Sequence, residues 1–119
     1  MINRKHRFHG RGSLRFVYQR GEVVRSSYGV LRYIHNPRRK TYRMAVVVSK
    51  KVSRSAVVRN RIRRRLYELV RVHESEITGP FDLAFIVYSD HLATMDAAEF
   101  RERIWEQFIK AGLAKTTDQ

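Results

Sequence analysis

The chain has 119 residues, a formal net charge of +14, 43% hydrophobic residues and no cysteine. The length suits one domain with a real core, and the lack of cysteine excludes disulfides and thiolate metal sites. No apolar stretch approaches the roughly 18 residues of a membrane-spanning helix, and no apolar segment of a secretory signal follows the basic N-terminus. We therefore expect a soluble cytoplasmic protein with a single domain, residues 1–119.

The charge is distributed unevenly along the chain. Residues 1–65 contain 20 Lys or Arg and one acidic residue, whereas residues 66–119 contain 5 Lys or Arg and 10 acidic residues. Arginine outnumbers lysine, and its planar guanidinium group can bind phosphate through two hydrogen bonds or stack on bases. This asymmetry predicts that one side of the molecule meets a polyanion, which we favour over a merely soluble basic protein.

The N-terminal part predicts an arm followed by a short helix. Residues 1–11 are basic and are expected to form a flexible arm. Ser13 is a candidate cap for the helix, and Gly21 is a candidate end. The apolar positions of this helix are Leu14, Val17 and Tyr18.

Extended chain should follow the short helix. Residues 22–35 are rich in β-branched and aromatic residues, which predicts one long bent strand or two short ones. After a turn at residues 36–40, the strongly apolar residues 42–49 predict a strand in the centre of a sheet. Residues 81–88 predict a second buried strand.

Two longer helices complete the pattern. The first should start at Ser53 or Ser55 and run to about Glu76, before Thr78-Gly79-Pro80 ends it. The second should be capped by Thr94 and ended by Gly112. Its predicted inward residues are Ala97, Phe100, Ile104 and Phe108.

The element order is therefore α-β-β-(β)-α-β-α. The strand–helix–strand unit over residues 42–88 implies that its two strands are parallel neighbours. We expect an α+β two-layer sandwich, a small mixed sheet with helices on one face. The other face would be free to bind a ligand.

Residues 50–65 are the most informative segment. Eight of these sixteen residues are Lys or Arg and none is acidic. Apolar residues recur at helical spacing through and beyond the run, so the charges belong to a helix anchored on a core. These apolar residues are Val58, Ile62, Leu66, Leu69, Val70 and Ile77.

The opposite side of this helix is predicted to face outward, with Asn60, Arg64, Tyr67 and Arg71. Like charges four residues apart repel, and cations oppose the dipole at a helix N-terminus. A locally costly pattern is typical of a functional site, here a surface for nucleic acid. The predicted RNA-binding residues are Lys50, Lys51, Arg54, Arg59, Asn60, Arg61, Arg63, Arg64 and Arg65.

Catalysis by the protein's own side chains is not predicted. The acidic residues are poorly placed, no Gly-rich phosphate loop is present, and the five histidines are scattered at 6, 9, 35, 73 and 91. We therefore expect no catalytic residues and no metal ligands in this chain. A DNA-binding helix in a major groove is a less favoured alternative.

The central motif resembles the signature of the protein subunit of bacterial ribonuclease P. The resemblance rests on Val48-Ser49-Lys50-Lys51 and on the segment from Ala56 to Leu66, with Arg59-Asn60-Arg61 as the hallmark. The basic arm, the short helix ending at Gly21 and the C-terminal strand and helix agree, so the resemblance covers nearly the whole chain.

The resemblance implies a function for this chain. The subunit's partner RNA would cleave precursor tRNA with Mg²⁺, held mainly by the RNA and substrate, to release the 5′ leader. The protein would bind that catalytic RNA through residues 50–65 and the single-stranded leader through the open sheet face and the first helix. Leu14, Tyr18, Arg32 and Tyr33 are the implied leader-binding residues. Tyr18 keeps the aromatic ring that the family usually carries at both helix positions, and Leu14 does not.

The resemblance also implies a fold like that of ribosomal protein S5 domain 2, with a left-handed crossover over residues 42–88. General connection rules favour a right-handed one. No obligate protein partner is implied. The alternative function is a structural ribosomal or assembly protein that also binds RNA.

Overall fold

The computed structural model describes residues 11–115, so the predicted basic arm lies almost wholly outside the described residues. None of the helices in this range is long and apolar enough to cross a membrane. The elements are α1 (Arg11–Arg20), β1 (Glu22–Arg25), β2 (Gly29–His35), β3 (Arg43–Val47), α2 (Ala56–Val72), η2 (Glu74–Glu76), β4 (Phe81–Val87), η3 (Asp90–Ala93) and α3 (Ala97–Lys110).

The four strands form one mixed sheet in the order β1-β2-β4-β3. β1 and β2 form an antiparallel hairpin, β2 pairs antiparallel with β4, and β3 pairs parallel with β4. The extended segment at residues 22–35 is thus two short strands. The prediction that the apolar strand after the turn is central is wrong, because β4 takes the centre and β3 lies at the edge.

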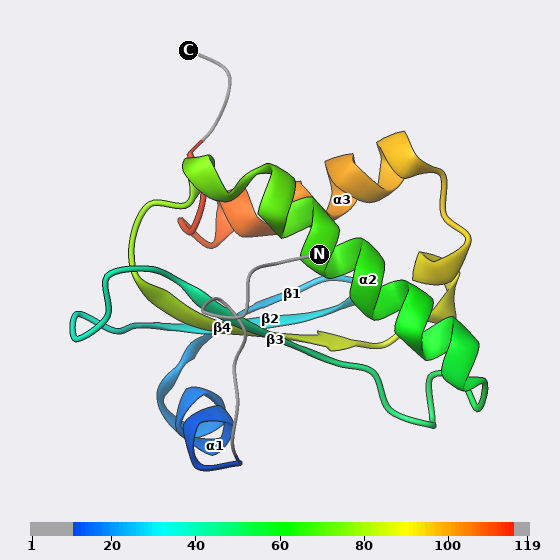
Figure 1. Ribbon diagram of the computed structural model, residues 1–119, viewed down its shortest axis with the longest axis horizontal. Coiled ribbons are helices and arrows are strands. Elements are labelled where there is room, and N and C mark those ends of the chain that lie inside the picture. Colours follow the sequence, from blue (N-terminus) through cyan, green and yellow to red (C-terminus); the bar gives the residue numbers. More distant parts are fainter. Residues whose placement is uncertain (1–10, 116–119) are drawn as a thin grey trace.

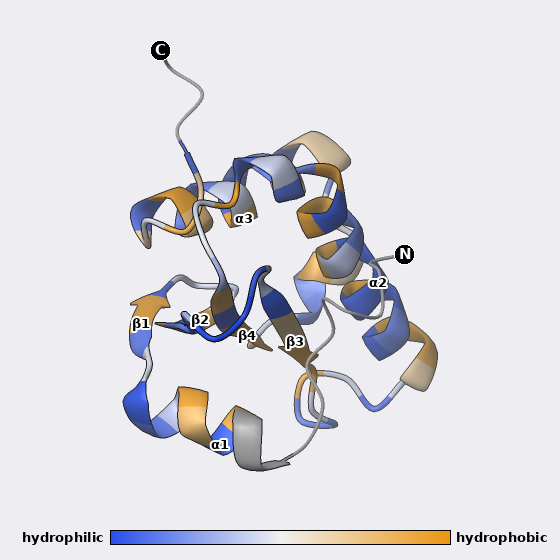
Figure 2. Ribbon diagram, turned by 60° about the vertical axis from the view of Figure 1, so that its left-hand side comes forward, coloured by the Kyte–Doolittle hydropathy of each residue, from blue (hydrophilic) through white to orange (hydrophobic). Residues whose placement is uncertain are grey.

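The three helices are divided between the two faces of the sheet. Figure 1 shows α2 and α3 above the sheet and α1 below it, and Figure 2 shows the same separation from another side. The prediction of helices on one face therefore holds for α2 and α3 but not for α1. Val17 of α1 is fully buried, so α1 partly covers the face that was expected to be free.

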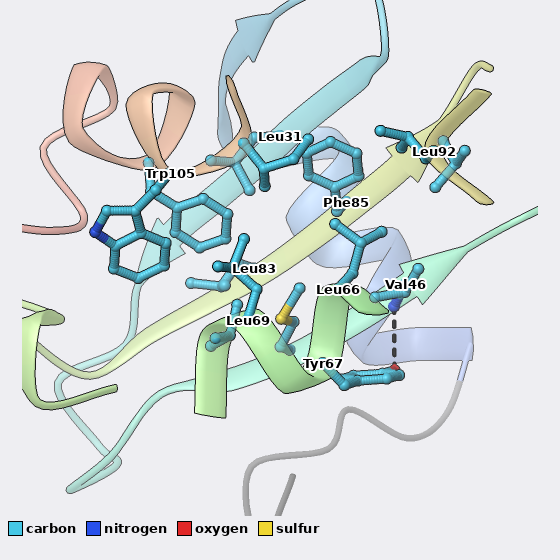
Figure 3. Packing of buried hydrophobic residues seen from close by; sticks show 14 of the residues in the cluster. Leu31, Val46, Leu66, Tyr67, Leu69, Leu83, Phe85, Leu92 and Trp105 are labelled. Atoms are coloured by element: carbon cyan, nitrogen blue, oxygen red, sulfur yellow. Dashed lines mark hydrogen bonds between the residues drawn. The ribbon is translucent and has the colours of Figure 1, made fainter. Parts of the chain in front are cut away.

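The main core lies between the sheet and the α2 and α3 layer. Leu31 and Phe85 are direct partners across β2 and β4 and are both fully buried. They meet Leu66 of α2 and Phe108 of α3 in one cluster, part of which Figure 3 shows. Burial of each such side chain contributes about 1.5–3 kcal/mol to folding.

The helix ends differ in part from the prediction. Ser55 caps α2, with its side chain accepting a hydrogen bond from Val58 N, but α2 ends at Val72 and η2 continues the segment. Ser13 cannot cap α1, because that helix already begins at Arg11. Gly112 follows α3 at φ +78°, a backbone conformation that favours glycine.

At the start of α3 two predicted roles are wrong. Asp96 is the cap in place of Thr94, because its carboxylate accepts hydrogen bonds from Ala98 N and Glu99 N. Thr94 instead ends the short helix η3. Ala97 is exposed, since it occupies the first turn beyond the edge of the core. Phe100, Ile104 and Phe108 are buried as predicted.

Tyr67 is buried, although it lies about 180° from Val58 around the helix and was predicted to face outward. Its hydroxyl accepts a hydrogen bond from Val46 N, 3.2 Å away (Figure 3). Val46 belongs to β3, which lies at the edge of the sheet formed by the described residues, so its outer N–H groups have no neighbouring strand there. The buried arc of α2 is wider than the apolar spacing predicts, because α2 packs on the sheet and also contacts this edge.

Replacing Tyr67 by Phe should remove the hydroxyl and leave the buried Val46 N–H without its partner. We expect a loss of about 1–3 kcal/mol in the free energy of unfolding. Urea unfolding of the variant and the wild type measures the loss, with Tyr88→Phe at an exposed position as the matched control. An unchanged midpoint in Tyr67→Phe would show that the hydrogen bond does not stabilise the edge.

Candidate nucleic-acid interface

The basic surface, defined here as Lys50, Lys51, Arg54 and the polar side of α2 from Arg59 to Arg65, begins in an ordered turn. Ser49 O accepts hydrogen bonds from Val52 N at 3.1 Å and Ser53 N at 3.5 Å. The turn holds Lys50 and Lys51 exposed to solvent directly after strand β3. Both ammonium groups are therefore presented from a hydrogen-bonded turn.

The N-terminus of α2 adds to the positive potential of this surface. Its first turn contains no acidic residue, so no side-chain carboxylate there compensates the positive end of the helix dipole. Arg54, Asn60, Arg61 and Arg64 are all exposed around this end. Five of the predicted RNA-binding cations, Lys50, Lys51, Arg54, Arg61 and Arg64, are thus exposed before and along the N-terminal half of α2, whose end itself attracts anions.

Arg59 and Arg63 have a different arrangement, since both are half-buried. Arg59 Nη1 donates to Ser53 O at 2.9 Å, and Arg63 Nη2 donates to Val48 O at 3.4 Å. Arg63 Nη1 also donates to Asn60 Oδ1 at 2.8 Å. These two arginines brace the turn against α2 and keep some guanidinium donors for a partner.

Arg65 makes its contacts within the protein. Its Nη1 donates to Leu92 O at 2.8 Å, its Nη2 donates to Met95 O at 2.7 Å, and its guanidinium carbon lies 4.4 Å from the centroid of the Phe100 ring. Burial lowers the pKa of Arg65, and the positive charge of Arg61 lowers it further. We therefore expect Arg65 to stabilise the fold rather than to contact RNA, because it fastens the segment between η3 and α3 to α2.

The second candidate surface is the α1 face, the face of the sheet that α1 partly covers. Alternation along the strands places one set of side chains on it, and the register aligns them in rows across β2, β4 and β3. The rows are Ile34, Asp82 and Arg43; then Arg32, Ala84 and Ala45; then Val30, Ile86 and Val47. Of these nine residues, six are only half-buried: Arg32, Ile34, Arg43, Ala45, Val47 and Ile86.

Tyr18 and Arg32 meet at the junction of α1 with this face. The guanidinium carbon of Arg32 lies 5.5 Å from the centroid of the Tyr18 ring, and Arg32 Nη1 donates to Tyr18 O at 3.1 Å. Burial raises the pKa of the Tyr18 hydroxyl, and the charge of Arg32 opposes that rise. Leu14 lies one turn before Tyr18 and is half-buried. Three of the four predicted leader-binding residues thus lie together.

Tyr33 is the fourth, and the structure places it apart from the other three. It follows Arg32 in β2, so alternation points it to the opposite face of the sheet. It is 9% exposed and packs edge to face with Phe81, with ring centroids 6.3 Å apart. Tyr33 belongs to the core under α2 and α3.

Phe16 is an exposed aromatic residue that the sequence prediction did not single out, with an exposed fraction of 51%. It lies about 160° from Leu14 around α1, on the side away from the Tyr18 and Arg32 pair. Helical spacing alone could have predicted its position on α1. It could not have predicted which side of α1 faces the open part of the sheet.

Asp82 is the one acidic residue of the aligned rows. Arg43 binds it with two hydrogen bonds, Nε to Oδ1 at 2.9 Å and Nη2 to Oδ2 at 2.8 Å, and Asn36 Nδ2 donates to Oδ2 at 2.9 Å. The carboxylate side chain is 5% exposed, and its charge is compensated by Arg43. On the α1 face, Arg32 can therefore attract a polyanion. No free carboxylate opposes it in these rows.

The part of the chain that the structure describes does not fit a metal centre. No group of three or more His, Asp or Glu side chains is placed to hold a metal ion there. The most buried carboxylate, that of Asp82, is already occupied by Arg43 and Asn36. The exposed cations and the Tyr18 ring are suited to binding phosphates and bases.

Comparison with solved structures supports the fold. The Staphylococcus aureus RNase P protein superposes with a TM-score of 0.83 at 24% identity, covering 92% of this chain and 98% of that one. The RNase P protein of Thermotoga maritima gives a TM-score of 0.75 at 22% identity, covering 84% and 92%. These two likenesses concern the fold alone.

Sequence comparison identifies the family. The family model described as Ribonuclease P matches residues 2–112. The chain is 29% identical over 97 residues to the ribonuclease P protein component of Synechocystis sp., covering 82% of this chain and 77% of the relative. It is 35% identical over 87 residues to that of Pseudanabaena sp., covering 73% and 75%. These matches support a ribonuclease P subunit over a structural ribosomal or assembly protein. This chain belongs to the ribonuclease P protein family.

Proposed function

We propose that this protein binds the ribonuclease P RNA through its basic surface and the 5′ leader of precursor tRNA through the α1 face. The observation that carries the proposal is the separation of two surfaces on one small domain. One presents exposed cations around the N-terminus of α2, and the other presents Tyr18 and Arg32 beside half-buried apolar residues. The first suits a phosphate backbone, and the second suits unpaired bases.

In this proposal the RNA carries out the phosphodiester cleavage, and no protein side chain is catalytic. Mg²⁺ would be held by RNA and substrate phosphates, since the described residues gather no ligand set for it. The protein contributes positive charge that stabilises the assembled RNA and holds the leader. The assembly would act in the cytoplasm, where precursor tRNA would be processed.

A cleavage assay tests the proposed function directly. At low Mg²⁺, added protein should restore 5′ processing of precursor tRNA by a bacterial ribonuclease P RNA, because protein cations replace part of the screening that Mg²⁺ provides. The measurement is the rate of leader release with and without protein. No stimulation at any ratio of protein to RNA would contradict the proposal and favour another RNA-binding role.

A double variant, Arg61→Ala with Arg64→Ala, should weaken binding to the ribonuclease P RNA without changing the melting temperature. If both side chains contact phosphates, the slope of log K against log salt should become less negative by about 0.7–0.9 per lost contact. Affinity measured across a series of salt concentrations gives this slope.

Arg65→Ala is the matched control on the same helix. It should lower the free energy of unfolding by about 1–3 kcal/mol, because two charged hydrogen bonds to main-chain carbonyls are lost. The salt slope of RNA binding, measured well below its melting temperature, should remain that of the wild type. A reduced slope in Arg65→Ala would restore this residue to the RNA contacts.

Tyr18→Ala should reduce the affinity of the holoenzyme for precursor tRNA more than for mature tRNA. Loss of one stacked base costs about 1–3 kcal/mol, which applies only to a substrate with a leader. Binding of the two tRNA forms to variant and wild-type holoenzyme measures the difference. Phe16→Ala on the far side of α1 is the control and should leave the ratio unchanged. Equal losses for both tRNA forms would place Tyr18 outside the leader site.

A further inference from the structure

A cavity of about 450 Å³ opens between α3 and the chain that follows α2. It lies at the C-terminal end of α2, whereas the basic surface surrounds the N-terminal half of that helix. We call it the Trp105 cavity, after the indole ring in its wall. Its lining includes His73, Glu76, Arg101, Glu102, Trp105 and Ile109.

His73 brings the two sides of this cavity together. It directly follows α2, and its backbone N–H donates to Leu69 O at 3.2 Å. Its Nδ1 lies 2.6 Å from Glu76 Oε2 of η2, and its ring centroid lies 5.0 Å from that of Trp105 in α3. The Trp105 ring also stacks on Phe108 in the core, with centroids 4.8 Å apart. One histidine therefore holds the Glu76 carboxylate beside the indole ring.

Two buried polar atoms at this place have no partner. Trp105 is 6% exposed, and its Nε1, a donor, has no hydrogen-bond partner among the described residues. Glu76 Oε1, an acceptor, is also buried and unpartnered there, while Oε2 of the same carboxylate is bound by His73. Figure 3 shows the indole nitrogen turned away from the hydrophobic cluster. Because buried polar atoms are normally hydrogen-bonded, the pair indicates a ligand that offers one acceptor and one donor.

The walls of the Trp105 cavity are acidic. Glu76, Glu102 and Glu106 line it, and Arg101 supplies a guanidinium group. Glu106 is paired with Lys110 at 3.2 Å, but Glu102 is exposed and forms no ion pair with a cation of the described residues. These carboxylates repel an RNA phosphate and attract an ammonium group. The donor of the ligand is therefore expected to be a cation.

We propose that the Trp105 cavity binds an α-ammonium group together with the carbonyl oxygen beside it, as found in an amino acid and at the N-terminus of a peptide. The ammonium group donates to Glu76 Oε1 and is attracted by Glu102. The adjacent oxygen accepts from Trp105 Nε1. Ile109 is half-buried at the cavity and offers an apolar contact for the ligand's side chain. A second carboxylate oxygen, present in a free amino acid, is attracted by Arg101.

Simpler ligands leave part of this site unsatisfied. A cation without an adjacent oxygen leaves Trp105 Nε1 unpartnered. A carboxylate without an ammonium group leaves Glu76 Oε1 unpartnered and is repelled by Glu102. The site also lies apart from the basic surface and the α1 face, so it does not depend on the proposed RNA-binding function.

Trp105 is the single tryptophan of the chain, so its fluorescence reports on the cavity in the full-length protein without a label. Leucinamide carries both groups and should change the emission in a saturable way. Isoamylamine lacks the carbonyl group and N-acetylleucinamide lacks the charge, and each should bind about 2- to 10-fold more weakly, as expected for one lost hydrogen bond. Tighter binding of leucine than of leucinamide assigns the site to free amino acids, and the reverse order assigns it to peptide N-termini.

Variants measured by calorimetry test the two halves of the ligand separately. Trp105→Phe keeps a ring and removes the N–H, so it should bind leucinamide about 2- to 10-fold more weakly and isoamylamine as the wild type does. Glu102→Gln should weaken both amines about 2- to 5-fold. Glu99→Gln removes an exposed carboxylate of the same helix outside the cavity and should bind like the wild type.

The inference is overturned if neither leucinamide nor leucine gives a saturable change, or if isoamylamine and N-acetylleucinamide bind as tightly as leucinamide. It is also overturned if Glu102→Gln and Glu99→Gln bind leucinamide equally. Glu102 is exposed, so this comparison holds even if Trp105→Phe fails to fold. Binding of ribonuclease P RNA should be the same with and without saturating leucinamide, so failure of the cleavage assay would bear on the proposed function and not on this site.

Discussion

Burial of the apolar side of α2 holds together a helix whose charges oppose its own formation. Ile62, Leu66 and Val70 are fully buried, and each contributes about 1.5–3 kcal/mol. Repulsion between like charges one turn apart costs only a few tenths of a kcal/mol per pair, and the unfavourable dipole at the N-terminus costs about 0.3–1 kcal/mol for each cation. The core contacts therefore exceed the electrostatic cost, so the segment can keep its arginines without acidic partners.

The same helix gives its arginines different functions according to their angle around the axis. Arg59 and Arg63 lie on the side toward the preceding turn, and Arg65 lies on the side toward η3. Each donates to main-chain carbonyl oxygens there. Arg61 lies about 40° from Arg65 around the axis but one turn nearer the N-terminus, and it remains exposed, as does Arg64. The run therefore contains two kinds of arginine. Some hold the turn and the segment after η3 against α2, and others are free to contact a partner.

The sequence predicts the elements well, because period and composition change clearly along the chain. It does not predict which apolar strand is central, because residues 42–49 and 81–88 are similar apolar runs and only pairing distinguishes them. The side of the sheet that α1 covers, and the burial of Tyr67 against the β3 edge, depend on tertiary contacts in the same way. For the leader-binding residues, alternation requires Arg32 and Tyr33 to face opposite sides, but the sequence does not say which side is open.

The Arg43 and Asp82 pair shows how a structural interaction can set the electrostatics of a binding face. A buried ion pair adds little net stability when compared with apolar residues, because both charges lose their hydration. Its effect here is local: Arg43 and Asn36 occupy both carboxylate oxygens of the acidic residue in the aligned rows. With that charge compensated, the potential above the sheet is set by Arg32 and, toward the end of the strands, by the adjoining basic surface. A single-stranded polyanion would then meet positive potential from the α2 N-terminus to α1, so that docking the RNA and holding the leader can be parts of one continuous path.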